Sequence, residues 1–366
     1  MSLRKRRHNM PYLASLKGKQ FLFGLLLVIS VMLYIIMGSP VGLVWPFSYV
    51  TDRDEQTSLW NFRDIGQQQL YLYDTILEYP WKSNRTRRDH FRQELANYRS
   101  ELSSSWSVVL HQENVTIKDH DKYVFHDNYN GISPELYKLL PKKTPLLHGK
   151  RYRSCAVVGN SGTILHSGCG KEIDMHDFIF RCNIPPLMPF ERDAGIKSNF
   201  STMNPSILRK RYNWLKNEEH IEKFNDMVSE YRGVLWSVCH AFHISLSLMM
   251  TAMRNLIVEN LDLVCANPMH VQAVTDFWYE RNLRARISTG FYMVTLAIQL
   301  CDEVTLYGFW PFSERYGANK TSVSYHYFDK STDKVAKGVH SMNKEFAFLM
   351  QLHNLGIIRI NIGSCK

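Results

Sequence analysis

The sequence predicts an α/β fold in which a largely parallel sheet is flanked by helices. Two observations lead to this prediction. Short apolar runs with the length of buried strands recur along the chain from about residue 155, and segments of helical character separate them. The predicted strands are residues 156–158, 178–180, 235–238, 261–264 and 304–308. The predicted helices are residues 206–232, 291–300 and 343–355, together with a helix within the charged segment 59–106.

An uncharged apolar stretch over residues 21–37 is long enough to cross a bilayer, which takes roughly 17–25 residues. Lys and Arg residues precede it, and none follows until Arg53, so the positive-inside rule places the N-terminus in the cytosol and the rest in the lumen. A cleaved signal peptide is the alternative, but the apolar core exceeds that of a usual signal. We expect a cytoplasmic tail over 1–19, a signal-anchor over 20–38, a stem over 39–58, an N-terminal lumenal extension over 59–150 and the main domain over 151–366.

The charge balance suggests an anionic partner. Lys and Arg number 44 against 34 Asp and Glu, a formal net charge of +10. Nucleic acid, a phosphosugar and an acidic glycan all fit this sign, but no basic–aromatic motif for nucleic-acid recognition is present. The basic segments 85–92 and 142–153 either attract an acidic partner or form an ordinary solvated face.

Sequons and cysteines agree with a lumenal body. Asn-x-Ser/Thr sequons occur at Asn84, Asn114, Asn199 and Asn319. The chain has seven cysteines, so in an oxidising compartment some form disulfides and at least one stays unpaired. A zinc site is an alternative reading of Cys239, His240, His243 and Cys265, although their spacing matches no standard finger.

Two segments have features of ligand-binding loops. Gly159-Asn160-Ser161-Gly162 follows the first predicted strand, where an open α/β sheet places its ligand loops, although a plain strand-to-helix turn is the simpler reading. It lacks the G-x-G-x-x-G spacing of a dinucleotide site. Ser288-Thr289-Gly290 precedes the apolar helix 291–300 and either only caps it or marks a phosphate site at its N-terminus.

One histidine is a candidate for proton transfer, and a second stands out by its aromatic neighbours. His340 lies just before the last predicted helix, with Glu345 in the first turns of that helix. The positive end of a helix keeps imidazole neutral and ready to accept a proton, whereas an exposed loop histidine is the simpler reading. His326 lies in an aromatic cluster that an edge strand would also explain. Asp-x-Asp pairs, which a metal-dependent nucleotide-sugar site would use, occur only at 52/54 and 119/121, and this favours chemistry without a metal.

Several segments, in their order along the chain, resemble the four sialylmotifs of the animal sialyltransferase family. Residues 155–162, 181–183 and 204–206 resemble the large motif, and 286–303 with 306–312 resemble the small motif and its continuation. Residues 326–329 resemble the third motif, and His340 with Glu345 matches the His-x4-Glu very small motif. The resemblance runs from about Cys155 to Cys365. The closing Cys365 is typical of the α2,8-sialyltransferases, and the Gly-Asn-Ser-Gly turn is similar to that of members making oligo- and polysialic acid on glycoproteins.

This resemblance implies a GT-A-like, Rossmann-type fold in a single lumenal catalytic domain, anchored in the Golgi membrane as a single-pass type II protein. It implies an inverting glycosyltransferase that moves sialic acid from CMP-sialic acid, without a metal or other cofactor, to the 8-OH of a terminal sialic acid on a sialylated glycoprotein. A ganglioside is the alternative acceptor, and an inactive sialoglycan-binding membrane protein is the alternative from another class. Nucleic acid is not an expected partner, and a homodimer is left open.

The resemblance also implies roles for individual residues. His340 would be the catalytic base and His326 would face the departing phosphate. The residues implied for binding CMP-sialic acid are Asn160, Ser161, Asn183, Ser288, Thr289, Gly290, Trp310, Tyr325 and Glu345. The implied disulfides are Cys155–Cys301 and Cys169–Cys365, which leave Cys182, Cys239 and Cys265 unpaired.

Two positions depart from the family pattern. Thr163 adds a residue directly after the Gly-Asn-Ser-Gly turn and could shift that turn. Residues 237–240 read Ser-Val-Cys-His where relatives commonly read Ile-Pro-Ala-Phe, which bears on the acceptor side.

Overall fold

The computed structural model describes residues 80–117, 124–125, 128–129, 132–146, 151–240, 243–315, 321–329 and 340–365. All of them belong to the second of two compact units, Thr57–Lys366. The predicted tail, anchor and stem lie outside the described residues, as does the sequon at Asn319. Within the described ranges no helix has the length and apolarity needed to span a bilayer.

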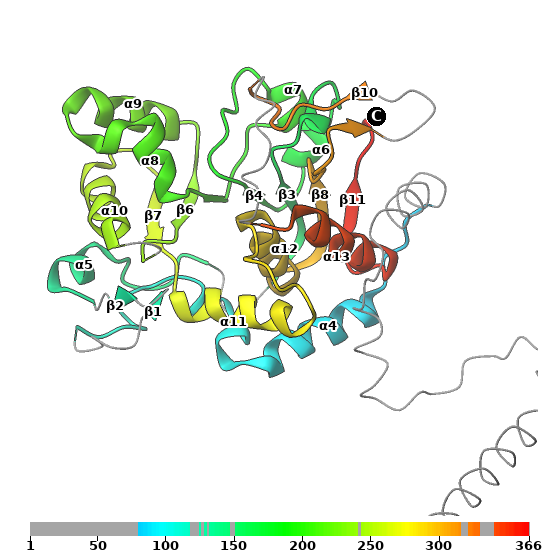
Figure 1. The fold of residues 1–366 in the computed structure, drawn as a ribbon, viewed down its shortest axis with the longest axis horizontal. Coiled ribbons are helices and arrows are strands. Elements are labelled where there is room, and N and C mark those ends of the chain that lie inside the picture. Colours follow the sequence, from blue (N-terminus) through cyan, green and yellow to red (C-terminus); the bar gives the residue numbers. More distant parts are fainter. Residues whose placement is uncertain are drawn as a thin grey trace, which may run out of the picture. The chain divides into compact units, whose positions relative to one another are not determined.

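A parallel sheet of seven strands forms the centre of this unit and confirms the predicted α/β class (Figure 1). In order across the sheet the strands are β11 (Arg359–Asn361), β8 (Cys301–Tyr307), β3 (Tyr152–Val158), β4 (Phe178–Arg181), β5 (Phe200–Thr202), β6 (Gly233–Ser237) and β7 (Leu261–Cys265). Every neighbouring pair is parallel. The five predicted strands are present, whereas β5 and β11 were not predicted because each has only three residues.

Helices cover the sheet and connect its strands (Figure 1). They are α4 (Arg85–Tyr98), α5 (Pro134–Leu139), α6 (Gly170–Asp174), α7 (Glu191–Ala194), α8 (Pro205–Arg211), α9 (Glu218–Val228), α10 (His243–Asn255), α11 (Pro268–Glu280), α12 (Thr289–Leu300) and α13 (Met342–Asn354). Two short antiparallel pairs join β1 (Val124–Phe125) to β2 (Asn128–Tyr129) and β9 (Glu314–Arg315) to β10 (Thr321–Ser322).

The prediction of one continuous helix over 206–232 is wrong. Helix α8 ends at Arg211, and α9 begins after Asn217, whose side chain caps it by accepting from the His220 N–H. Between them the backbone of three consecutive residues is left-handed, with φ of 41° at Asn213, 64° at Trp214 and 55° at Leu215. A left-handed run is incompatible with a continuing right-handed helix, and nothing in the residue types announces it.

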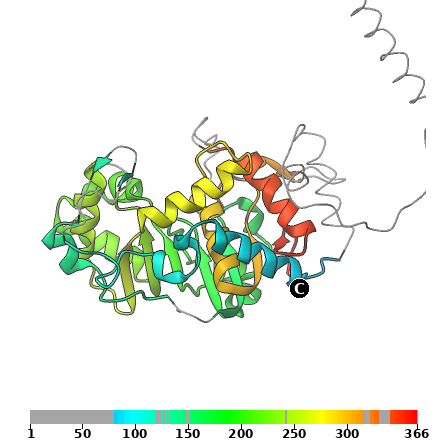
Figure 2. The same cartoon turned by 90° about the horizontal axis from the view of Figure 1, so that it is seen from below.

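The predicted helix over 291–300 is present as α12, and it is almost entirely buried. It packs on β3 and β8 on one side and on α11 on the other. Trp278 of α11 contacts the rings of Phe291 in α12 and Phe348 in α13, at centroid distances of 4.8 Å and 5.5 Å. Helix α4 lies along α11 in both views (Figures 1 and 2), where Phe91 meets Phe277 edge-on. Burial on all sides explains why residues 291–300 lack a polar face.

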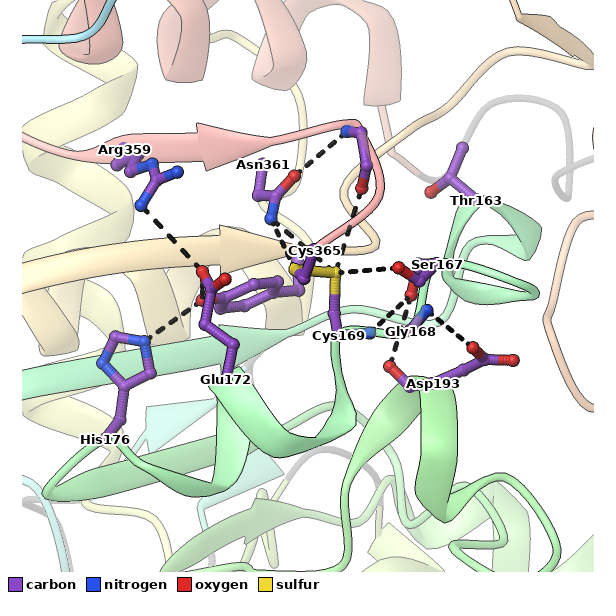
Figure 3. The surroundings of a disulfide bond; sticks show 12 residues. Thr163, Ser167, Gly168, Cys169, Glu172, His176, Asp193, Arg359, Asn361 and Cys365 are labelled. Atoms are coloured by element: carbon purple, nitrogen blue, oxygen red, sulfur yellow. Dashed lines mark hydrogen bonds and ion pairs between the residues drawn. A yellow bond between two sulfur atoms is a disulfide. The ribbon is translucent and has the colours of Figure 1, made fainter.

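Two disulfides match the pairs that the resemblance implies. Cys155–Cys301 joins the neighbouring strands β3 and β8, and Cys169–Cys365 joins the loop after β3 to the C-terminal end. Figure 3 shows the surroundings of the second bond. There the carboxylate of Asp193 accepts from the N–H groups of His166 and Gly168, both at 2.8 Å. Residues 166–169, which follow the Gly-Asn-Ser-Gly turn, are thus held by Asp193 and by the disulfide to Cys365.

The expectation that Cys239 and Cys265 stay unpaired is wrong, because they form a third disulfide. The register of β6 and β7 sets Ser237 beside Cys265, so Cys239, two residues further on, comes within 5.3 Å of Cys265 between Cα atoms. This bond uses both thiols of the alternative zinc site and excludes that reading. Cys182 is the free cysteine, and it is buried.

Candidate active site

The turn after β3 lies at the carboxyl edge of the sheet, where β3 and β8 end side by side. The N–H of Gly159 donates to the Tyr307 carbonyl at 2.8 Å, and the N–H of Ser161 donates to that of Gly308 at 3.1 Å. A Cβ at Gly159 would collide with the Gly308 carbonyl, which explains the glycine. Thr163 lies in a short 3-10 turn beyond it and does not line the cavity described below.

Two asparagines project from this edge. The Asn160 Nδ2 donates to the Cys182 carbonyl at 2.9 Å, while its Oδ1 is buried without a hydrogen-bond partner in the described part of the chain. Asn183 has φ of 57°, a region that Asn tolerates, and its N–H donates to Thr202 Oγ1 at 2.9 Å. Asn160 therefore has an acceptor oxygen free for a ligand.

The N-terminus of α12 faces the same space. Ser288 caps the helix, its Oγ accepting from the Phe291 N–H at 3.1 Å. The N–H groups of Thr289 and Gly290 have no acceptor among the described residues. Free N–H groups at the positive end of a twelve-residue helix can bind an anion.

Glu345 of α13 holds Ser288 in place. Its two carboxyl oxygens accept from the backbone N–H and the Oγ–H of Ser288, each at 2.6 Å. The side chain is 4% exposed, and this burial raises the pKa of Glu345 to about 7, although the two hydrogen bonds oppose the shift. Near neutral pH a substantial fraction of this carboxyl therefore keeps its proton.

His340 lies just before α13, and one of its ring nitrogens is hydrogen-bonded to the backbone. Its Nδ1 lies 2.8 Å from the backbone carbonyl of Arg286, which can only accept, so Nδ1 carries the hydrogen. In the neutral ring Nε2 then holds the lone pair. This is the tautomer in which Nε2 can take a proton from a bound hydroxyl.

His326 belongs to a group of aromatic side chains between β10 and α13 in the sequence. Its Nδ1 lies 2.9 Å from Asp329 Oδ2, and its ring stacks on Phe328 at 4.9 Å with an interplanar angle of 9°. Tyr325 packs beside it, and burial raises the pKa of the Tyr325 hydroxyl, with a smaller contribution from Glu345. Trp310 is fixed by an Nε1–H donated to the Glu314 carbonyl at 2.9 Å.

One open cavity, here called the central cavity, brings all of these residues together, with an empty volume of about 900 Å³. Its lining includes every residue that the sequence proposes for catalysis or donor binding: Asn160, Ser161, Asn183, Ser288, Thr289, Gly290, Trp310, Tyr325, His326, His340 and Glu345. Sequence reasoning assigned no role to Asn204, Phe309 or Phe346, which also line it. Asn204 and Phe309 stand inside quoted motifs, so a signal for them was present.

A second cavity, here called the arginine cleft, is also lined by His340 and has an empty volume of about 1750 Å³. His340, Asn204, Ser288 and Thr289 line both spaces. Its lining includes Arg209, Arg284 and Arg286 but no Asp or Glu. None of these guanidinium groups has a carboxylate partner among the described residues. An uncompensated cluster of this kind favours an anionic ligand.

The sequence matches the family model of glycosyltransferase family 29, described as sialyltransferase, over residues 105–357. The chain belongs to this family. It is 32% identical over 306 residues to alpha-2,8-sialyltransferase 8F of Mus musculus, covering 81% of this chain and 74% of that protein.

Two solved structures are also similar. A mammalian sialyltransferase in complex with Gal-beta-1-3GalNAc-ortho-nitrophenol is 22% identical with a TM-score of 0.45, over 73% of this chain and 95% of that one. Another structure of a mammalian sialyltransferase is 22% identical with a TM-score of 0.41, over 86% and 87%.

As a sialyltransferase, the chain uses CMP-sialic acid as its donor. The family is independent of metal ions. Among the described residues no group of three or more His, Cys, Asp and Glu side chains is placed to hold one. A phosphate at the amides of Thr289 and Gly290 would meet positive electrostatic potential from the helix itself.

Three arginines of the basic segments of this sialyltransferase contact its own domain. Arg92 donates to the carbonyls of Ile298 and Cys301, and burial lowers its pKa to about 10. Arg151 pairs with Asp302 and Arg153 with Asp177. These contacts favour a structural role for these three arginines over attraction of an acidic acceptor.

Three of the four predicted glycosylation sites lie in the described residues. Asn84 caps α4 through its Oδ1, which accepts from the Arg87 N–H. Asn114 donates both Nδ2 hydrogens inward, to the carbonyls of Trp106 and Val109. Asn199 accepts from the Ile179 N–H through its Oδ1.

Proposed function

We propose that this sialyltransferase forms α2,8 linkages, transferring sialic acid with inversion from CMP-sialic acid to the 8-OH of a terminal sialic acid on a glycoprotein glycan. The observation that carries the proposal is the position of His340. It lines both the central cavity and the arginine cleft, with Nδ1 committed to Arg286 and Nε2 left as the proton acceptor.

The donor would occupy the central cavity. The carboxamides of Asn160 and Asn183, with Ser161, would contact the CMP, and Trp310 and Tyr325 would line the nucleotide or sugar. The phosphate would lie at the N–H groups of Thr289 and Gly290, within the segment that Glu345 holds through Ser288. His326, which lines the same cavity, would face the phosphate. These groups would stabilise the negative charge that grows on the leaving phosphate.

The reaction needs one bond to break and one to form. The bond from the anomeric carbon to the phosphate oxygen breaks, and its electron pair leaves with CMP. The acceptor oxygen bonds to the opposite face of that carbon, which inverts its configuration, and the hydroxyl proton passes to Nε2 of His340. General-base help of this kind typically contributes ~10²–10⁴-fold.

The acceptor would enter through the arginine cleft. A terminal sialic acid carries a carboxylate, and Arg209, Arg284 and Arg286 offer uncompensated guanidinium groups beside His340. The name of the mouse relative, alpha-2,8-sialyltransferase 8F, also supports this linkage. Intact Asn160, Asn183, His326 and His340 argue against an inactive sialoglycan-binding protein.

The proposal includes the cellular setting. We propose that residues 20–38 anchor the chain in the Golgi membrane as a single-pass type II protein, with residues 151–366 as a lumenal catalytic domain of GT-A-like fold. Sequons and disulfides support an oxidising, lumenal compartment.

The test is transfer to matched acceptors. Purified full-length chain is incubated with CMP-sialic acid and a sialylated N-glycoprotein, the same glycoprotein after sialidase treatment, or a ganglioside, and products are analysed by mass spectrometry and linkage analysis. We expect α2,8-linked product on the sialylated glycoprotein and none after sialidase. Transfer to the sialidase-treated acceptor, in a linkage other than α2,8, would overturn the proposal. A product on the ganglioside alone would mean that the acceptor is a glycolipid.

A further inference from the structure

A third cavity, here called the Trp214 pocket, continues the arginine cleft away from His340. The two spaces share Pro205, Ser206 and Arg209 of the α8 region, so they are adjacent over that helix. We propose that the Trp214 pocket binds the neutral hexose or N-acetylhexosamine that precedes the terminal sialic acid of the acceptor, and that Trp214 and Arg209 determine specificity for it. This inference rests on the proposed function.

The backbone presents Trp214 in an unusual way. Asn213, Trp214 and Leu215 are all left-handed, although none is glycine. Such conformations are strained and persist where the surrounding structure enforces them, often at binding sites. Leu215 is buried, and its N–H donates to the Tyr212 carbonyl at 2.8 Å, which holds the turn. Trp214 itself stays half-buried at the pocket wall.

The chemistry of the pocket suits a sugar ring. Its lining is mostly apolar, with the Trp214 indole, Pro205, Leu248 and Ile244, whose side chain is 59% exposed. The Arg209 guanidinium lies 5.9 Å from the Trp214 ring centroid and adds a donor that cannot lose its charge. An aromatic surface beside a charged hydrogen-bond donor matches a pyranose, which has an apolar C–H face and a rim of hydroxyls.

The order of the spaces specifies which sugar lies there. The reacting hydroxyl must meet His340, where the central cavity and the arginine cleft adjoin. The carboxylate of the same terminal sialic acid would meet the guanidinium groups of the arginine cleft. The next ring along the acceptor then reaches Arg209, which lines both the arginine cleft and the Trp214 pocket.

The test compares acceptors of different length. Initial rates of the full-length chain are measured with CMP-sialic acid and methyl α-sialoside, a sialylated trisaccharide, or a ganglioside. We expect the wild type to have a lower KM for the trisaccharide than for the methyl sialoside. Trp214→Ala should raise the KM for the trisaccharide by about tenfold, the scale of one aromatic contact, and leave kcat and the KM for the methyl sialoside within about twofold. Trp214→Tyr should restore most of the trisaccharide KM.

A second variant keeps the test independent of folding at the strained turn. Ile244→Trp should fill the exposed pocket and raise the trisaccharide KM, whereas Ile257→Trp, at a residue 80% exposed and outside the pocket, should not. If Ile244→Trp has the same KM as the wild type for the trisaccharide and for the methyl sialoside, the subsite is overturned. The proposed function would still stand. A KM change confined to the ganglioside would mean that the Trp214 pocket binds the lipid part of the acceptor, and would overturn the proposal that it binds a sugar. If the wild type transfers to none of the acceptors, both proposals fall.

Discussion

His340 and Arg286 are joined by a 2.8 Å hydrogen bond between the imidazole Nδ1 and a backbone carbonyl, although 54 positions separate them in the sequence. The bond orients the ring and selects the tautomer with a lone pair on Nε2. Because the partner is a backbone atom, no side-chain substitution at 286 removes it, and the role of His340 has to be tested on the histidine itself.

Replacing His340 should remove transfer and spare donor binding. In His340→Ala we expect kcat to fall by ~10²–10⁴-fold, the usual range for loss of a general base, with CMP affinity and melting temperature near those of the wild type. His90→Ala, at an exposed position on α4, is the control and should be silent. Near-normal turnover of His340→Ala would remove His340 from this role.

The carboxyl of Glu345 should make stability depend on pH. The pKa of Glu345 is about 7 in the folded chain, whereas in the unfolded chain it has the usual value of 4.5. Between these values the folded state binds more protons, so raising the pH favours unfolding. Glu345→Gln cannot titrate but can still accept from Ser288.

Melting temperatures of both proteins should therefore be compared between about pH 5 and pH 8. We expect the wild type to lose more stability than Glu345→Gln as pH rises. Parallel curves would mean that Glu345 is ionised in the folded chain throughout this range.

Removing one guanidinium from the arginine cleft should weaken acceptor binding. For Arg284→Gln we expect the KM for a sialylated acceptor to rise about ten- to hundredfold, the scale of a hydrogen bond to a charged group, with the KM for CMP-sialic acid unchanged. Arg254→Gln removes the same charge from the exposed end of α10, outside the cleft, and serves as the control. An equal effect of both variants would point to net charge instead of a local contact.

The donor side of the site could be predicted from sequence far better than the acceptor side. In a parallel sheet the carboxyl ends of all strands lie at one edge, so Asn160 after β3 and Trp310 after β8 converge whatever the details of packing. Arg209 and Arg284 come from an exposed helix face and a loop after α11, where arginine is ordinary. The Cys239–Cys265 bond depends on the register of β6 and β7, which no local pattern reveals.

The three disulfides predict a distinct pattern of thiol labelling. All seven cysteines are accounted for by three bonds and Cys182. Burial raises the pKa of the Cys182 thiol to about 12, so the native chain should not react with iodoacetamide at neutral pH. After unfolding without reductant we expect one labelled cysteine, and after reduction seven. Labelling of Cys239 and Cys265 beside Cys182 in the unreduced, unfolded chain would mean that the Cys239–Cys265 bond is absent.

The sequons at Asn84 and Asn114 should differ in glycan occupancy. At Asn84 only Oδ1 is needed to cap α4, so a glycan on Nδ2 is compatible with the fold. At Asn114 both Nδ2 hydrogens are donated, at 3.1 Å and 2.9 Å, and Oδ1 accepts from the His111 N–H at 2.8 Å. A glycan there would break at least one of these bonds and leave a carbonyl unsatisfied, which costs about 1–3 kcal/mol where it is buried.

When the protein is expressed through the secretory pathway, glycopeptide mass spectrometry should therefore find a glycan on Asn84 and none on Asn114. Asn114→Asp should be the informative variant for stability, because it removes the two donors and places a carboxylate against the Trp106 and Val109 carbonyls. We expect it to lower the melting temperature, while Asn84→Asp keeps the capping oxygen and leaves the melting temperature close to that of the wild type. High occupancy at Asn114 in the folded, active chain would contradict the inward orientation of its amide.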